Sequence, residues 1–377
     1  MKKYLTIIAG ALLTAACSSD NDVATVDKTA AGAIRFNIVM DEADAQTRAA
    51  NEMTSDNWTQ KAFGIFAAYT GPLKYEQTTV SCDFMYNQKV ECLNDSWEYS
   101  PVSYWPNDQR EYLSFYGYAP YTETLATDDE GGIVDMSRNY DLGDPWLNFR
   151  LPARPWGENA NQVDLLYMQK KDGDGQNATY TPWENQQRPG DVATTLKFTF
   201  LHALACVGDT ITLSMSQALA ERIEGFATIT VDSINIDYKN LTTKARLVLR
   251  TTGGVANWKE IISGELTTTR SFGHKWDTPL TVGTTAQKIF QGTGLLYIPL
   301  QVRGTDAPYA EVTVSYTVNN GVAQHSGTTT GRFPLDLNLE GKKQNINLVM
   351  GENLPLNQLV MPVGGNANEP SFARQTK

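Results

Sequence analysis

The sequence predicts an all-β protein made of two β-sandwich domains in tandem, and three observations support this prediction. Short runs of apolar, aromatic and β-branched residues recur along the 377-residue chain, separated by glycine, proline and asparagine turns. The runs form two groups on either side of a turn-rich stretch at residues 143–190. Helical periodicity is almost absent, with one short candidate at residues 217–223.

The limits of each part follow from the same pattern. A chain of this length with 41% hydrophobic residues can bury two cores. We expect a signal peptide at residues 1–17, then a polar tether with one strand, a possible propeptide, at residues 18–48. A first sandwich at residues 49–190, a second at residues 191–350 and a tail at residues 351–377 follow.

The N-terminus has the layout of a bacterial lipoprotein signal peptide. It reads MKKYLTIIAGALLTAAC, in which two lysines precede a short apolar run and two alanines precede Cys17. The run is shorter than the roughly 20 residues that span a bilayer. Cleavage before Cys17 would leave a lipidated cysteine, whose acyl chains hold a membrane at about 0.8 kcal/mol per buried methylene. A secretory signal with an incidental cysteine is the alternative.

One alternating strand precedes the first predicted domain. Within residues 33–40, one face carries four apolar side chains at a period of two: Ile34, Phe36, Ile38 and Met40. At about 1.5–3 kcal/mol each, they would contribute on the order of 6–12 kcal/mol. A whole domain is stable by only about 5–15 kcal/mol. Loss of this strand would therefore leave an open apolar groove.

Three cysteines remain after Cys17. Cys82 and Cys92 could form a disulfide between neighbouring strands in an oxidising compartment, and two separate buried thiols are the alternative. Cys206 lies in the apolar run LHALACVG and is predicted to be a core residue. Three cysteines do not make a disulfide framework.

Composition and motifs argue against several classes of function. The net charge of −11 disfavours nucleic acid and anionic membrane surfaces as partners. The chain has only three histidines, and we find no nucleophile, zinc or phosphate-loop motif. The run KKDGDG at residues 170–175 departs from a calcium loop at its later ligand positions. We therefore predict no catalytic residues, no metal and no cofactor.

Aromatic residues crowd into residues 97–121. Exposed aromatic platforms can bind glycans. However, the alternation in YLSFYGY places half of these rings in a core. A core role is the simpler interpretation, and a glycan-binding surface is the alternative.

Several segments resemble, in order, the fimbrillin-like proteins of the Bacteroidales. They read FGIFAAY from residue 63, FMYNQKV from 84, WEYSP from 97, YWP from 104, LSFYGYAPY from 113, VDLL from 163 and LKFTFLHALA from 196. The resemblance covers about residues 34–350. It implies two transthyretin-like β-sandwich domains and a structural or adhesive role in a type V pilus, without catalytic residues. It also implies an outer-membrane lipoprotein at the cell surface that joins a fimbrium after processing.

The same resemblance gives a role to the sequence Thr47-Arg48-Ala49. Fimbrillins that polymerise are exported as lipoproteins and cut after an arginine by a surface protease, and Arg48 stands at the matching place. A cut between Arg48 and Ala49 would release the lipid together with the strand at residues 33–40. The groove could then accept a strand of another subunit by β-augmentation. An exposed linker arginine is the alternative.

The donor strand should be a detachable terminal strand with alternating apolar residues. Two segments are candidates, with these residues: Ile346, Leu348 and Met350 before the tail, and Leu356, Leu359 and Met361 within it. The expected partners are other fimbrial subunits and, through the lipid, the outer membrane. The alternative function is a lipid-anchored adhesin, a pilus anchor or tip, or a glycan-binding protein that is not cut at Arg48. Such a protein would bind a host or bacterial surface glycan or protein.

Overall fold

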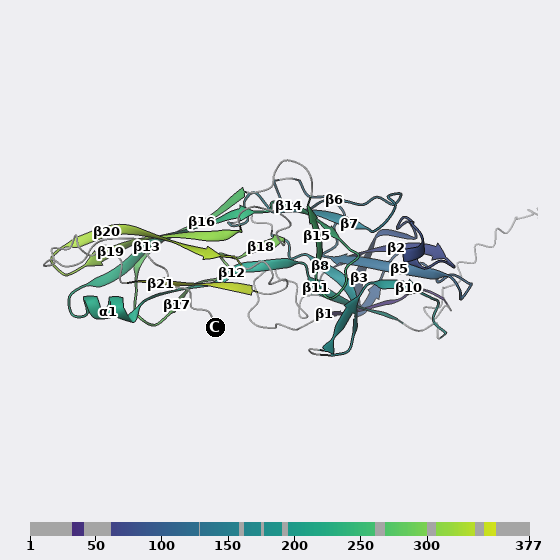
Figure 1. Cartoon of the computed structure of the whole chain (residues 1–377), viewed down its shortest axis with the longest axis horizontal. Coiled ribbons are helices and arrows are strands. Elements are labelled where there is room, and N and C mark those ends of the chain that lie inside the picture. The colour runs from purple at the N-terminus through teal and green to yellow at the C-terminus, as the bar shows by residue number, and fades with distance from the viewer. Residues whose placement is uncertain are drawn as a thin grey trace, which may run out of the picture.

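The computed structural model describes the chain in nine stretches: 32–40, 62–127, 129–157, 162–174, 177–190, 195–260, 268–299, 307–335 and 343–351. The described residues form an elongated molecule built almost wholly of strands (Figure 1). One short α-helix, α1 (Gln217–Ile223), begins after Ser216, whose side chain accepts a hydrogen bond from the Leu219 amide. Among these residues no helix is long and apolar enough to cross a membrane.

Nine strands form the largest sheet, toward one end of the long axis (Figure 1). They are β1 (Phe36–Met40), β2 (Phe63–Gly71), β3 (Met85–Leu93), β4 (Ser96–Glu98), β5 (Tyr112–Ala119), β8 (Leu166–Asp172), β9 (Thr179–Thr181), β10 (Trp183–Gln186) and β11 (Leu196–His202). The main path runs β1-β11-β8-β5-β2-β3-β4, with β10 beside β5 and β9 beside β8. Every pair is antiparallel except β1 with β11, which is parallel.

The central strands of this sheet are buried on both faces. On β5, Phe115 packs into one apolar core, while its neighbour Tyr116 packs into a second core on the opposite face. Phe63 and Phe66 divide in the same way on β2. This double burial explains why both strands read as continuous apolar runs in the sequence.

A four-stranded sheet covers part of one face of the nine-stranded sheet. Its order is β15-β14-β7-β6, and its strands are β6 (Gly132–Met136), β7 (Trp146–Arg150), β14 (Lys244–Val248) and β15 (Asn257–Glu260). Leu147, Phe149 and Leu247 lie in the same core as Tyr116. These inner side chains therefore bury one face of the large sheet.

Strand pairing crosses the predicted boundary at residue 190. β14 pairs with β7, and β11 pairs with β8, although the members of each pair lie on opposite sides of that boundary. The apolar inner side of the hairpin β6–β7 needs partner strands, and residues 244–260 supply them. Strands on the two sides of residue 190 therefore share sheets. The division into two tandem sandwich domains stays a prediction.

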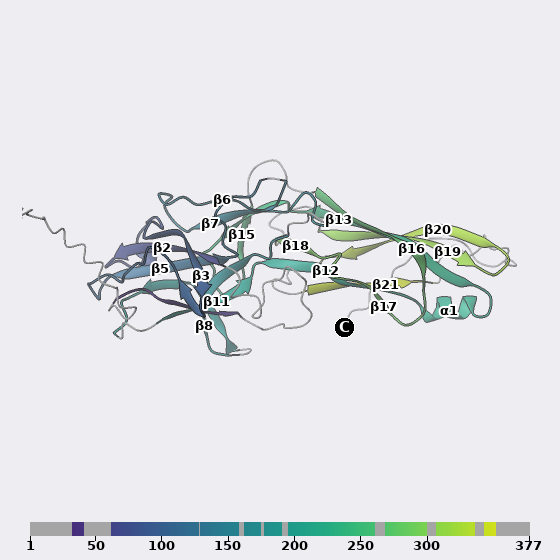
Figure 2. The same ribbon diagram turned by 180° about the vertical axis from the view of Figure 1, so that it is seen from behind.

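Two further four-stranded sheets face each other toward the other end of the molecule, as Figure 2 shows from behind. One contains β12 (Leu204–Met215), β17 (Gln287–Gln291), β18 (Leu296–Pro299) and β21 (Lys343–Met350). The other contains β13 (Thr228–Leu241), β16 (Thr268–Thr281), β19 (Tyr309–Asn319) and β20 (Gln324–Pro334). Burial alternates strictly along β19, because its inner side chains fill the core between the two layers.

The three described cysteines are free, so the predicted Cys82–Cys92 disulfide is not formed. Cys82 points into the core beside Tyr75, whereas Cys92 lies on β3 opposite Trp97 of β4. The two side chains therefore belong to different environments. Cys206 is buried in the core, as the sequence predicted.

Burial should also make the thiols unequal in reactivity. Desolvation raises the pKa of Cys82 to about 12, so almost no reactive thiolate exists at this position at neutral pH. We expect a thiol-alkylating reagent to label Cys92 in the native chain and to spare Cys82 and Cys206. Peptide mass spectrometry after brief labelling checks this. Equal labelling of Cys82 and Cys92 before unfolding would contradict it.

Candidate assembly site

The N-terminal strand β1 lies at an edge of the nine-stranded sheet. The structure contains this strand within the range that the alternation predicted, and it runs parallel to β11 with Phe36 beside Leu196 and Ile38 beside Phe198. The Leu196 amide also donates a hydrogen bond to the carbonyl oxygen of Arg35 over 2.8 Å. In the described part of the chain, β11 is the one strand that pairs with β1.

The chain just before β1 is also held from the other side, by residues that follow β4. The Ile34 amide donates to the carbonyl of Ser103 over 3.0 Å, and the Trp105 amide donates to the carbonyl of Gly32 over 2.8 Å. The Tyr99 hydroxyl donates to the carbonyl of Ile34 over 2.9 Å. Since β1 and β4 are the two ends of the sheet path, this segment joins both ends and closes the sheet around its core.

Phe36 is the centre of that closure. Its ring centroid lies 5.2 Å from those of Tyr99 and Phe198, 6.2 Å from that of Phe115 and 6.4 Å from that of Phe63. These rings come from β11, β5, β2 and the segment after β4. Edge-to-face and tilted aromatic pairs of this kind contribute about 0.5–1.5 kcal/mol each beyond the burial of their area.

Two of the four predicted core side chains of the strand are fully buried. Ile34 and Phe36 are 1% and 4% exposed, and Ile38 is partly buried against the same core. The Met40 side chain lies outside the described residues. Ile34 and Phe36 together are worth about 3–6 kcal/mol of burial, which is still a large share of the stability of one domain.

The other candidate strand, β21, belongs to the far end of the molecule. It runs parallel to β12, with Ile346 beside Ile211, Leu348 beside Leu213 and Met350 beside Met215. Ile346, Leu348 and Met350 are at most 3% exposed. This strand therefore completes the core of its own layer.

Six predicted site residues cannot be placed on this fold. Those that lie outside the described residues are Cys17, Arg48, Ala49, Leu356, Leu359 and Met361. The chain order alone gives one useful fact about Arg48. It lies between β1 and β2, so a cut there would separate β1 from the remaining strands.

His202 and the aromatic cluster at residues 97–121 were the candidates for catalysis and glycan binding. The imidazole Nδ1 of His202 lies 2.9 Å from Oδ1 of the buried Asp164. Four of the nine rings in residues 97–121 are buried at 4% exposure or less, namely Trp105, Phe115, Tyr116 and Tyr118, and Trp97 and Tyr99 are partly buried against the core. A search of the described residues finds no group of three or more metal-binding side chains.

The fold and the position of β1 define an all-β sandwich protein whose first strand closes a core from the edge of a sheet. The chain belongs to the fimbrillin-like family, because the family model matches residues 47–361. This is a family of fimbrial and adhesion proteins and not of enzymes.

One curated protein and one solved structure are similar to the chain. It is 28% identical over 169 residues to the fimbrium subunit Fim1C of Phocaeicola vulgatus, across 44% of this chain and 42% of that protein. The match thus spans less than half the length of that curated relative. The structure is similar to that of a fimbrial protein from Bacteroides vulgatus, with a TM-score of 0.59 and 18% identity over 85% of this chain and 94% of that chain. This similarity confirms the predicted β-sandwich fold class.

Proposed function

We propose that the protein is a structural subunit of a type V fimbria, assembled by removal of the N-terminal strand and donor-strand exchange. The family and both fimbrial relatives support the fimbrial role. The position of β1 supports the exchange, because this strand fills an aromatic core from an edge and pairs with a single strand. That position is the observation on which the proposal depends.

A cut after Arg48 would turn β1 into a separate peptide. It would then be held by its pairing with β11, by the hydrogen bonds around Ile34 and by its buried side chains. Departure of the peptide would expose the rings of Phe115 and Phe198 and leave one edge of β11 unpaired. A strand from another subunit could fill this groove by β-augmentation.

The tail at residues 351–377 is a better donor than β21. Withdrawal of β21 would empty three apolar positions of its own core, and large-to-small losses of this kind cost about 2–5 kcal/mol each. An exchange that used Leu356, Leu359 and Met361 would leave β21 in place. We therefore assign the donor role to the tail.

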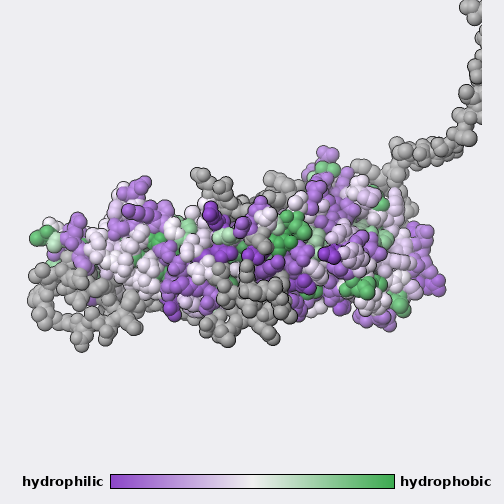
Figure 3. Space-filling model, turned by 90° about the horizontal axis from the view of Figure 1, so that it is seen from above, coloured by the Kyte–Doolittle hydropathy of each residue, from purple (hydrophilic) through white to green (hydrophobic). Residues whose placement is uncertain are grey.

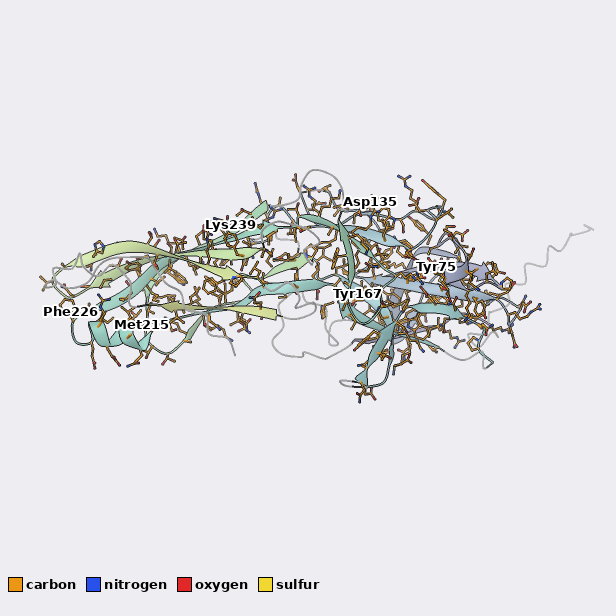
Figure 4. All side chains as sticks on the ribbon, viewed as in Figure 1. Tyr75, Asp135, Tyr167, Met215, Phe226 and Lys239 are labelled. Atoms are coloured by element: carbon orange, nitrogen blue, oxygen red, sulfur yellow. The ribbon has the colours of Figure 1, made fainter. Side chains whose placement is uncertain are left out.

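The geometry of β21 favours head-to-tail assembly. Its last residue, Met350, accepts a hydrogen bond from the Ser216 amide at the start of α1. Met215 lies toward the end of the molecule opposite Tyr75, which belongs to the region of the nine-stranded sheet (Figure 4). The tail starts near Met215 and would fill the β1 groove of the next subunit. Each subunit would repeat this head-to-tail contact, and a series of such contacts that does not close into a ring forms a filament.

The lipid on Cys17 would serve as a temporary tether under this proposal. It would carry the uncut subunit to the outer membrane and the cell surface, and the cut after Arg48 would release the subunit into a fimbrium. The N-terminus of the protein in sheared fimbriae tests this step. Ala49 is the expected first residue. A lipidated Cys17 in assembled material would contradict processing and favour an anchor, tip or adhesin that stays on the membrane.

Truncation tests the assignment of the donor. A chain that ends at Gly351 keeps β21 and every described strand, so we expect it to fold and to be exported. We also expect it to form no fimbriae, because it lacks the donor. Electron microscopy of cells and gel filtration of the released subunit check both points. Normal fimbriae from the truncated chain would show that the tail is not the donor.

A further inference from the structure

The outer side of the four-stranded sheet β15-β14-β7-β6 carries a concentration of positive charge. Inner side chains such as Leu147 and Leu247 are in the core, so their neighbours along each strand face outward. We call this outer surface the basic face and define it by seven residues: Asp135, Trp146, Asn148, Arg150, Lys244, Arg246 and Lys259. Four of the seven are cations in a chain whose net charge is −11.

The cations of the basic face lie directly opposite one another. Lys244 pairs in register with Arg150, and Arg246 pairs in register with Lys259. Like charges in directly opposite positions destabilise a sheet. No ion pair relieves Lys244 or Lys259 within the part of the chain that the structure describes. The pairing thus brings four cations together on one face, where an anionic partner would offset the repulsion of the two lysines.

One polar row crosses all four strands of the sheet. In register order it contains Lys259, Arg246, Asn148 and Asp135. Arg246 is fixed there, because its guanidinium lies 3.7 Å from the centre of the Trp146 ring and its Nε donates to Asn148 Oδ1 over 3.0 Å. Asn148 in turn donates to Asp135 Oδ2 over 3.2 Å.

Lys259 of the basic face is exposed, Asn148 is buried, and the other five residues are half-buried. Asp135 lies at the upper edge of the molecule in Figure 4, and the view from above shows hydrophilic residues interspersed with apolar patches along this side (Figure 3). Strands about 4.8 Å apart and rows roughly 7 Å apart make a patch some 14 Å across, the size of a few sugar units. The row thus has cations at one end and a carboxylate at the other, joined by the buried amide of Asn148.

We propose that the basic face binds an acidic polysaccharide. Carboxylate or sulfate groups of such a polymer would pair with the cations, and its hydroxyls would donate to the half-buried carboxylate of Asp135. A single-stranded nucleic acid would need an open aromatic ring on which its bases could stack, and Trp146, the aromatic residue of the basic face, is covered by Arg246. A protein partner would need an apolar anchor, and here the ring of Trp146 is covered by Arg246. This activity goes beyond filament assembly and does not depend on strand exchange.

Binding of the full-length chain to immobilised polygalacturonate and dextran sulfate tests the proposal. We expect both to bind at low salt, with affinity falling as salt screens the charges, and neutral dextran not to bind. The double variant Lys244→Gln/Lys259→Gln should weaken binding by roughly ten-fold or more. The matched control, Lys275→Gln/Lys288→Gln, removes two exposed lysines from β16 and β17 and should bind as the unchanged chain does.

Several results would overturn the proposal. Neither acidic polysaccharide binds, or the two double variants bind equally well, or polyglutamate binds as tightly as polygalacturonate, which would indicate an acidic polypeptide. Circular dichroism checks that both double variants are folded. A loss of binding then reports the loss of the two lysines and not unfolding. A binding defect in the first variant with normal fimbriae on cells would separate this site from assembly.

Discussion

Replacing Phe36 by alanine is expected to lower the free energy of unfolding of the uncut chain by about 3–5 kcal/mol. The reason is that the Phe36 ring is 4% exposed and contacts four other rings where the two ends of the sheet path meet. Its loss leaves a cavity that four separate segments would have to fill. Urea denaturation of purified protein, with the change read from the shift in midpoint at constant slope, measures the effect.

The control for this substitution lies on the neighbouring strand. Lys197 is exposed on β11 beside Asn37 of β1, and Lys197→Ala keeps the pairing of the backbone. We expect it to change the free energy of unfolding by no more than about 0.5 kcal/mol. A loss below about 1 kcal/mol for Phe36→Ala would mean that β1 is not an integral part of the core.

Replacing Arg48 by glutamine is expected to abolish fimbriae while leaving the subunit folded. The uncut chain keeps β1 in its groove, because the strand remains joined to β2 and the groove is already filled. The subunit should therefore accumulate in the outer membrane with its lipid. Immunoblots of sheared surface material and of membranes, with electron microscopy of the cells, measure the distribution.

Arg110→Gln is the matched control for this experiment. Arg110 is exposed and pairs with Asp108 two residues away, far in sequence from the proposed cut. Cells that carry this change should assemble fimbriae normally. Normal fimbriae from Arg48→Gln cells would show that the cut, if it occurs, is made elsewhere or is not needed.

The sequence predicted where the strands lie along the chain better than which strands pair with each other. Alternation and turn residues identify most strands, including β1, because these signals act over a few residues. Pairing between β7 and β14 joins residues almost a hundred positions apart, and no local pattern reports it. The boundary expected at residue 190 followed from turn-rich composition, which marks loops and not the limits of a core.

The sequence predicted the strand of the candidate site but not the residues that hold it. The alternation in residues 33–40 indicated a strand with a buried face, but the residues that hold it from the other side, Tyr99 and Ser103, gave no signal of that role. Their contact with Ile34 exists because the sheet closes on itself. The basic face was likewise not predicted, since Arg150 and Lys259 come onto one face only through the pairing of β7 and β15 with β14.

The central claim is that β1 must leave its groove before subunits can join. Val39 and Thr199 are register partners on β1 and β11, and adjacent strands bring Cα atoms within the range that a disulfide bridges. In cells with Val39→Cys/Thr199→Cys, we expect oxidation to hold β1 in place after the cut and to block fimbriae. Reduction should restore them, and either single variant should assemble normally. Fimbriae built from subunits with an intact β1–β11 disulfide would contradict the claim.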